Sequence, residues 1–346
     1  MIGLIFSLDY EIYGDGEGEF QKLMIDPTEK LLSIFNRYGA KLTIMVEVAE
    51  IIAAKRYKEF ETVCNHIEMQ LKHALSQKHD IQLHIHPQWF NANYVSGCWN
   101  LDFDEYSMAH LSKGKSLEYI NIGKKYLENL GKEVDNNYDC IAFRAGNWLM
   151  QPSLNIVQAL EMCGLKYDTS VFKWGKIRND KFSLDYTEAA SNLFPWRIDP
   201  TDINKSSKRT GLYEIPILTT KSFILTMLTS KRLAIQKKSN QHAIVSQKRA
   251  FNHPISFVDL LKSAARDFRL WYPKKFDFCR MTFKEMKSCI DYAVETCMHL
   301  QEVVPVVAIG HSKDFSDDGV IERFLDYVNS RKEIQYTTFT RLKSGI

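Results

Sequence analysis

Apolar positions along the chain alternate between two kinds of pattern. Short continuous apolar runs, as in residues 2–8, 41–48 and 80–86, are typical of buried strands. Elsewhere apolar residues recur every three or four positions, as in amphipathic helices, over 27–38, 55–77, 112–130, 153–163, 282–300 and 320–329. Further strand patterns occupy 140–143, 213–217, 303–309 and 334–339. This alternation predicts an α/β fold with a parallel sheet, either open or closed into a barrel.

The segment 27–38 also carries the end signals of a helix. Asp26 is a predicted N-cap, Pro27 suits the first helical position, and Glu29 would complete a capping box. Gly39 follows the last apolar position and predicts the C-terminal end of the helix. We therefore expect a helix that begins at Pro27.

Composition narrows the class of protein. The 346 residues carry a formal net charge of +3, which is too balanced for a dedicated nucleic-acid-binding protein. The seven cysteines are scattered without a CxxC pair, a usage typical of a reduced, cytoplasmic protein. The first apolar run lacks the basic flank of a secretion signal, and no apolar stretch is long enough to span a bilayer. We expect one cytoplasmic domain over residues 1–346.

One segment differs from the rest in charge. Residues 215–258 contain no Asp or Glu, but they contain Lys221, Lys231, Arg232, Lys237, Lys238, Lys248 and Arg249. We interpret this segment as a basic insertion on the α/β domain. Such a surface would suit an anionic group, such as a diphosphate or a membrane surface, although an ordinary basic surface loop is an equal alternative.

Polar side chains follow three of the apolar runs at the points where the predicted strands end. They are Asp9 and Glu11, His84 and His86, and His311. Side chains two positions apart on a strand point to the same face, so each of the first two pairs shares a face. An isolated HxH pair can be a hydrogen-bonded core feature. Because strand ends meet at one edge of an α/β sheet, the three clusters together favour a catalytic metal site of His and carboxylate ligands.

Five short motifs occur in an order that resembles a known family. FSLDYE, KHDIQLHIHPQW, AFRAGNW, GLYEIPI and GHSKDF resemble the ordered motifs of the polysaccharide deacetylase superfamily, also called NodB-homology or carbohydrate esterase 4-like. The resemblance covers residues 2 to about 342. It implies a distorted (β/α)7-type barrel and metal-dependent removal of an acyl group from an N-acylated sugar. The branch would be one tied to surface-glycan biosynthesis, such as O-antigen or capsule.

The resemblance also implies catalytic roles for individual residues. Asp9 matches the family's general base, Arg144 the arginine that pairs with it, and His311 the general acid. Asp168 or Asp199 would orient His311, and the sequence leaves this choice open.

The resemblance likewise implies a set of metal ligands, which are Glu11, His84 and His86. Two positions depart from the family pattern. Tyr10 stands where a second Asp usually binds metal, and Gln88 stands where the second histidine usually lies. We therefore expect His86 to take the place of that histidine, with Gln88 as the alternative.

A third group of residues is expected to contact substrate: Gly146, Asn147, Trp148 and Trp89. Glycine would allow the backbone to approach a ligand closely, an amide could help to stabilise an oxyanion, and Trp148 offers an aromatic face to a sugar. Simple packing of Trp148 in the protein interior is an equal alternative.

The cofactor implied is a divalent metal, with zinc favoured and cobalt, nickel, manganese or iron also compatible. The implied partner is an N-acylated sugar, a nucleotide sugar or a lipid-linked saccharide, with no nucleic acid, and the basic insertion allows peripheral membrane contact. Two alternatives stay open. One is a catalytically inactive carbohydrate-binding or scaffold member of the fold, and the other is an amidohydrolase that acts on another small amide.

Overall fold

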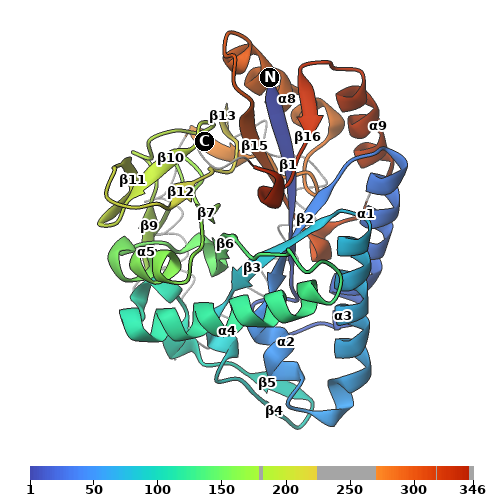
Figure 1. Ribbon diagram of the computed structural model, residues 1–346, viewed down its shortest axis with the longest axis vertical. Coiled ribbons are helices and arrows are strands. Elements are labelled where there is room, and N and C mark those ends of the chain that lie inside the picture. The colour runs from blue at the N-terminus through green and yellow to red at the C-terminus, as the bar shows by residue number, and fades with distance from the viewer. Residues whose placement is uncertain (179–181, 224–269, 317, 343–346) are drawn as a thin grey trace.

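A curled sheet forms the centre of the computed structural model, which describes residues 1–178, 182–223, 270–316 and 318–342 (Figure 1). The strand order is β11-β10-β12-β7-β6-β3-β2-β1-β15, and β16 pairs with β1. The strands are β1 (Ile2–Tyr10), β2 (Leu42–Glu47), β3 (Asp80–Ile85), β6 (Ala142–Ala145), β7 (Tyr167–Asp168), β10 (Trp196–Asp199), β11 (Asp202–Ser206), β12 (Tyr213–Glu214), β15 (Val304–His311) and β16 (Ile334–Tyr336).

The sheet is parallel from β12 to β15, and a short segment after β12 brings its two ends together. The amide of Ile217 donates to the carbonyl of Val171, which follows β7, at 2.9 Å. The next amide, from Leu218, donates to the carbonyl of Val307 in β15 at 3.0 Å. The backbone at residues 217–218 thus hydrogen-bonds both to the segment after β7 and to β15, which lie far apart in the strand order. The α/β fold class and the distorted (β/α) barrel expected from the sequence are confirmed.

Helices lie around the outside of the curled sheet (Figure 1). They are α1 (Asp26–Arg37), α2 (Val48–Ala54), α3 (Glu61–Ser76), α4 (Lys113–Lys132), α5 (Ser153–Met162), α8 (Phe283–Cys297) and α9 (Asp318–Asn329). The long helix expected over 55–77 is shorter, because the chain is extended at Tyr57 and separates α2 from α3.

The start of the first helix differs from the sequence expectation. A π-helical turn, Gln21–Ile25, runs directly into α1, so Asp26 lies inside the helix and is not its N-cap. Glu29 accepts a hydrogen bond from the side chain of Gln70 at 3.1 Å and completes no capping box. Pro27 has no N–H to give to a preceding carbonyl, which suits a junction between two helical geometries.

Three small two-stranded antiparallel sheets complete the described strands. They are β4 (Asn93–Val95) with β5 (Cys98–Asn100), β8 (Lys176–Arg178) with β9 (Ser183–Asp185), and β13 (Thr219–Phe223) with β14 (Trp271–Lys275). Of the basic insertion expected over 215–258, only residues 215–223 are described. Lys221 lies on β13, and the other six basic residues of the segment lie outside the described residues.

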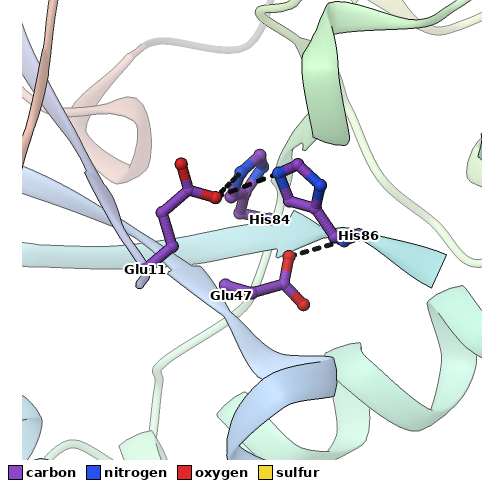
Figure 2. A group of neighbouring side chains, drawn as sticks. All are labelled: Glu11, Glu47, His84 and His86. Carbon is purple, nitrogen blue, oxygen red and sulfur yellow. Dashed lines mark hydrogen bonds and ion pairs between the residues drawn. The ribbon is translucent and has the colours of Figure 1, made fainter. Parts of the chain in front are cut away.

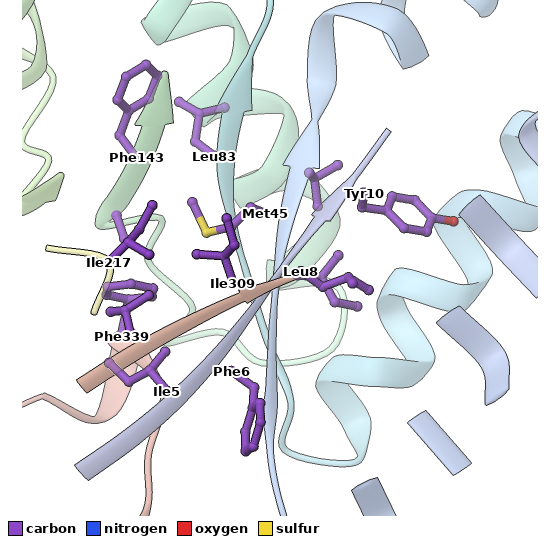
Figure 3. Packing of buried hydrophobic residues seen from close by; sticks show 14 of the residues in the cluster. Ile5, Phe6, Leu8, Tyr10, Met45, Leu83, Phe143, Ile217, Ile309 and Phe339 are labelled. Atoms are coloured by element: carbon purple, nitrogen blue, oxygen red, sulfur yellow. The ribbon is translucent and has the colours of Figure 1, made fainter. Parts of the chain in front are cut away.

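The core of the barrel is built around β1, whose nine residues are all buried. Phe6 of this strand packs edge-on against three other rings, with centroid distances of 4.9 Å to Phe35, 5.3 Å to Phe278 and 6.2 Å to Phe324. Figure 3 shows Phe6 within the surrounding packing. A strand buried on both faces reads as a continuous apolar run, which explains the pattern of residues 2–8.

All seven cysteines are free thiols, in agreement with their scattered spacing. Among the described residues, no helix has both the length and the apolar character needed to cross a bilayer.

Replacing Phe6 tests the packing around β1. Phe6→Ala should lower the free energy of unfolding by about 3–5 kcal/mol, because it removes a buried aromatic ring and leaves a cavity. Denaturant unfolding measures this. As a control, Met69→Ala on α3, where Met69 is 66% exposed, should change stability by no more than about 0.5 kcal/mol. Equal effects of the two substitutions would contradict the packing described.

Candidate active site

Strand register places the polar residues of the sequence motifs at one edge of the barrel. Asp9 on β1 is the direct partner of His311 on β15. His84 on β3 is the direct partner of Glu47 on β2 and of Arg144 on β6. Residues in register on parallel strands point to the same face, and this edge holds the carboxyl ends of the strands. The sequence expectation that these motifs converge is therefore confirmed.

Four side chains of metal-binding type form one buried group, Glu11, Glu47, His84 and His86, with one ligand atom from each lying within 4.8 Å of the others (Figure 2). The Oε2 atom of Glu11 lies 3.2 Å from Nε2 of His84 and 3.0 Å from Nε2 of His86. Two imidazoles and two carboxylates are a donor set that suits zinc and similar divalent ions.

The ring of His84 is oriented by the backbone of the next strand. Its Nδ1 lies 2.9 Å from the carbonyl oxygen of Arg144, which can only accept, so Nδ1 carries the proton and donates. Burial lowers the pKa of His84, but the hydrogen bond from Nε2 to Glu11 and the charge of Asp9 outweigh it and raise the pKa. A bound cation would displace the proton on Nε2 and use its lone pair. This carbonyl contact is the arrangement that fixes the tautomer of metal-binding histidines.

His86 faces the same group from just beyond the end of β3, and Gln88 lies behind it. The Nδ1 atom of His86 is 3.4 Å from the amide nitrogens of both Gln88 and Asn147. In the described chain, Oε1 of Gln88 is buried without a hydrogen-bond partner. Either amide nitrogen can donate to Nδ1, which leaves Nε2–H to donate to Oε2 of Glu11 at 3.0 Å until a cation takes the place of that proton. Gln88 thus contacts His86 and not the carboxylate group.

Glu47 is a member of this group that the sequence reasoning missed. Its Oε2 accepts from the backbone amide of His86 at 2.5 Å, and its Oε1 accepts from the amide of Ala49 at 2.9 Å. Burial and the nearby carboxylates of Glu50 and Glu11 raise the pKa of Glu47 well above its ordinary value. A divalent cation would relieve this repulsion. The sequence signal that could have identified Glu47 was an acidic residue near the end of the strand predicted over 41–48.

Glu11 also contacts a lysine, Lys313, which the sequence reasoning missed as well. The Nζ atom of Lys313 lies 2.8 Å from Oε1 of Glu11 and 2.9 Å from the carbonyl oxygen of Ile12. Burial opposes ionisation of Glu11, but Lys313 and the two histidines outweigh it and hold its pKa well below the ordinary value. Glu11 is therefore a carboxylate, with Oε2 facing the histidines and Oε1 held by the lysine.

Asp9 pairs with Arg144, as the motif resemblance predicted. An Nη1 atom of Arg144 contacts Oδ1 of Asp9, and both side chains are buried. The guanidinium is fixed by two further bonds, from Nη2 to the hydroxyl of Ser7 at 2.7 Å and from Nε to the carbonyl of Thr169 at 3.0 Å. Burial raises the pKa of Asp9, but Arg144 and the histidines overcome this, so its pKa lies below the ordinary value.

His311 lies between two acids. Its Nε2 is 3.5 Å from Oδ2 of Asp9, and its Nδ1 is 3.8 Å from Oδ2 of Asp314. Nδ1 has no hydrogen-bond partner within the described part of the chain. Asp314 itself is held by Arg280 through contacts of 2.8 and 2.7 Å. Burial lowers the pKa of His311.

Neither acid that the sequence offered to orient His311 is one of these two neighbours. Asp168 accepts from the hydroxyl of Ser170 at 2.8 Å. Asp199 accepts from the backbone and hydroxyl of Thr201 in a turn. The acid on the Nδ1 side of His311 is instead Asp314, three residues later in the last motif, at 3.8 Å.

Asp168 forms a buried carboxyl pair with Glu214 of β12. Burial and the charge of Asp168 raise the pKa of Glu214 well above the ordinary value. Oε2 of Glu214 meets no hydrogen-bond donor among the described residues. Burial likewise raises the pKa of Asp168, so a proton on one member of the pair relieves the repulsion between the two carboxyl groups. This pair supports the chain beside Arg144 and has no part in the group of metal-binding type.

The expected substrate residues lie in different surroundings. A Cβ on Gly146 would come within 2.7 Å of both the His86 ring and the carbonyl of Ile85, so glycine here lets His86 pack on the backbone. Asn147 and Trp148 have φ values of 55° and 57°, a strained conformation for residues other than glycine. Trp148 packs edge-on to His311, with centroids 5.9 Å apart.

Trp89 and Tyr10 pack against side chains outside the group of metal-binding type. Trp89 is 1% exposed and packs against Trp99, so its part in substrate binding stays a prediction. Tyr10 faces the opposite side of β1, where its hydroxyl donates to Oε1 of Gln70 at 2.8 Å (Figure 3). The sequence departure at Tyr10 therefore leaves the group of metal-binding type intact, because Glu11 supplies the carboxylate.

Comparisons with known proteins agree on the fold. No family model and no curated protein matches the chain. The 4-alpha-glucanotransferase from Thermococcus litoralis has a similar structure, with a TM-score of 0.52 and 12% identity, over 98% of this chain and 39% of that one. The GH57-type branching enzyme from the hyperthermophilic archaeon Pyrococcus horikoshii has a TM-score of 0.50 and 11% identity, over 98% of this chain and 69% of that one.

Polysaccharide deacetylases are also among the similar structures. That from Bacillus cereus has a TM-score of 0.39 and 12% identity, over 98% of this chain and 92% of that one. At these identities the likeness concerns the fold alone. The chain also spans only about two fifths of the length of the glucanotransferase, so nothing about activity follows from it.

The buried pair of Asp168 and Glu214 predicts a specific pH dependence of stability. The pKa of Glu214 is higher in the folded protein than its ordinary value of 4.5 in the unfolded chain. The stabilisation that its bound proton contributes is therefore lost as pH rises from 4.5 through the folded-state pKa. Glu214→Gln removes this titration. The stability of the variant relative to wild type should therefore rise with pH, by up to about 1.4 kcal/mol per unit.

Denaturant unfolding between mildly acid and alkaline pH measures this difference. The matched control is Glu188→Gln, at an exposed glutamate, whose difference from wild type should stay flat. Parallel curves for wild type and Glu214→Gln would show that the pair does not share a proton.

Proposed function

We propose that the protein is a metal-dependent hydrolase that removes an N-acyl group, with acetyl favoured, from a sugar or sugar precursor. The observation that carries this proposal is the adjacency of two units at one strand edge. The four side chains of metal-binding type lie beside Asp9, which has its own arginine and a histidine as neighbours. A purely structural ion-pair network would not need two histidines with inward-facing nitrogens.

Glu11, His84 and His86 would hold the metal, and Glu47 lies close enough to act as a fourth ligand or as the support of His86. Zinc suits this donor set best, and cobalt, nickel, manganese or iron would also be accepted. A bound divalent ion supplies Lewis acidity, which polarises an amide carbonyl and makes water more acidic.

Asp9 is suited to take the proton from the attacking water. Arg144 keeps it ionised and fixes Oδ1, which leaves Oδ2 on the side of His311. A carboxylate whose pKa is held low is a weak base, but its fixed position beside the reacting water offsets this. The roles of Asp9 and Glu11 are thus divided, with one carboxylate for the proton and the other for the metal.

His311 is suited to protonate the leaving amine. Because burial lowers its pKa, most of its rings are neutral at neutral pH in the free protein. The proton that Asp9 gains in the first step lies one short transfer away, since Oδ2 and Nε2 are 3.5 Å apart. Passing that proton through His311 to the amine would balance the reaction without a second acid.

The sugar substrate rests on the motif resemblance, with support from the half-buried indole of Trp148 beside His311. Within this class, the proposal names an N-acylated sugar, a nucleotide sugar or a lipid-linked saccharide of glycan biosynthesis in the cytoplasm. An inactive carbohydrate-binding protein would bind such sugars without releasing acetate. An amidohydrolase of another kind would prefer a small amide without a sugar in a substrate panel.

Removal of one proposed ligand tests the metal site. His84→Ala should lower zinc affinity by at least about 100-fold, the upper end for loss of a residue that merely supports a ligand. Elemental analysis after equilibration with buffered zinc measures the bound metal. His110→Ala, at an exposed histidine, is the control and should keep the wild-type content. Full zinc stoichiometry in His84→Ala would rule out His84 as a ligand.

Substitution of the proposed base tests the division of roles between the two carboxylates. Asp9→Asn should lower kcat for acetate release by about 10²–10⁴-fold and leave zinc bound, because Asn keeps the shape but cannot take a proton. The matched control is Asp318→Asn at the start of α9, which should keep wild-type turnover. Near-normal activity of Asp9→Asn, or loss of its zinc, would contradict the assignment.

A further inference from the structure

The ammonium group of Lys275 lies over two aromatic rings. Lys275 ends β14, and its direct partner on β13 is Thr219. Its ammonium nitrogen is 3.1 Å from the centroid of the Trp148 ring and 4.6 Å from that of Phe172. An ammonium group over aromatic rings is stabilised by their negative faces, so the position of the charge is well defined.

The same indole connects Lys275 to the candidate active site. Trp148 packs edge-on to His311, so the lysine and the histidine contact one ring. The indole nitrogen of Trp148 also has no hydrogen-bond partner among the described residues. A cation and an unused N–H donor therefore lie beside the histidine that would protonate the leaving amine.

The charge of Lys275 lacks the counter-ion that the other lysine of the site has. Lys313 pairs with Glu11 at 2.8 Å, whereas Lys275 makes no ion pair with any carboxylate in the described ranges. Burial and the like charge of Arg280 lower the pKa of Lys275 to about 7, with Arg144 acting in the same direction. Asp277 and Asp9 oppose this lowering. An ammonium in such a position gains more from an incoming anion than a solvated one does.

We propose that Lys275 binds an anionic substituent of the substrate, a phosphate or a carboxylate carried by the sugar near its N-acyl group. This proposal rests on the proposed function and deepens it, since it makes the substrate an acidic N-acyl sugar. The aromatic faces of Trp148 and Phe172 would line the same subsite. Lys275 would select the substrate, and it has no part in the proton transfers.

Equilibrium binding tests this selection independently of turnover. Calorimetry would compare N-acetylglucosamine, its 1-phosphate and N-acetylmuramic acid, which represent the neutral, phosphate and carboxylate forms of the ligand. Wild-type protein should bind at least one acidic ligand about 10-fold more tightly than the neutral sugar, as expected for a charge-assisted hydrogen bond. The ligand with the larger preference identifies the anion.

Three variants locate the source of the preference. Lys275→Met keeps the aliphatic stem on Trp148 and removes the charge, so the ratio of acidic to neutral affinity should fall to about one. Lys275→Arg keeps the charge and should keep the preference. Lys287→Met on α8 is the matched control, because Lys287 also lies over an aromatic ring, 4.6 Å from the centroid of Tyr327, but pairs there with Asp291 and contacts no described residue of the site. This variant should keep the wild-type ratio.

The pH dependence offers a second readout. With the carboxylate ligand, whose own charge is constant above about pH 5, the preference should weaken as pH rises through about 7, because Lys275 loses its proton there. Equal affinities in wild type, undetectable binding of all three ligands, or a preference that survives in Lys275→Met would overturn the proposal. The proposed hydrolase function fails separately, if the acidic ligand binds with this preference but no acetate is released.

Discussion

The arrangement of the site depends on two buried carboxylates, each of which has its negative charge balanced by a different cationic side chain. Asp9 and Glu11 lie two positions apart at the end of the fully buried strand β1, and their charges repel each other. Each has its own cation, Arg144 for Asp9 and Lys313 for Glu11. Buried charges persist only when they are paired in this way. Because the two partners differ, the two carboxylates become chemically different although only one residue separates them in the sequence.

The fold supplies these partners from distant parts of the chain. Arg144 comes from β6 and is held by Ser7 and Thr169, and Lys313 follows β15, which pairs with β1 along its whole length. Closure of the barrel through Ile217 links β15 to the side of the sheet that carries Arg144. The site therefore exists only in the assembled sheet, and the local sequence around Asp9 is not sufficient to form it.

Much of this edge was predictable, because period-two spacing and strand ends are local properties. Asp9, Glu11, His84, His86 and His311 all end apolar runs, and they do lie together. Glu47 was missed because it ends its strand without a second polar residue at matching spacing. The choice between His86 and Gln88 depends on the backbone beyond β3, and the pairing of Asp168 with Glu214 depends on strand order. The assignment of Asp26 as N-cap was wrong, because an N-cap signal in the sequence cannot reveal a preceding π-helical turn.

The most direct test of the central claim is anomalous diffraction at the zinc edge from crystals equilibrated with zinc. The account predicts one strong peak enclosed by Glu11, His84 and His86, with Nε2 of both histidines facing it. Lys313 should remain on Oε1 of Glu11, and Asp9 should remain with Arg144, outside the coordination sphere. A peak elsewhere, or a zinc ion bound by Asp9 in place of Glu11, would contradict the division of roles between the two carboxylates.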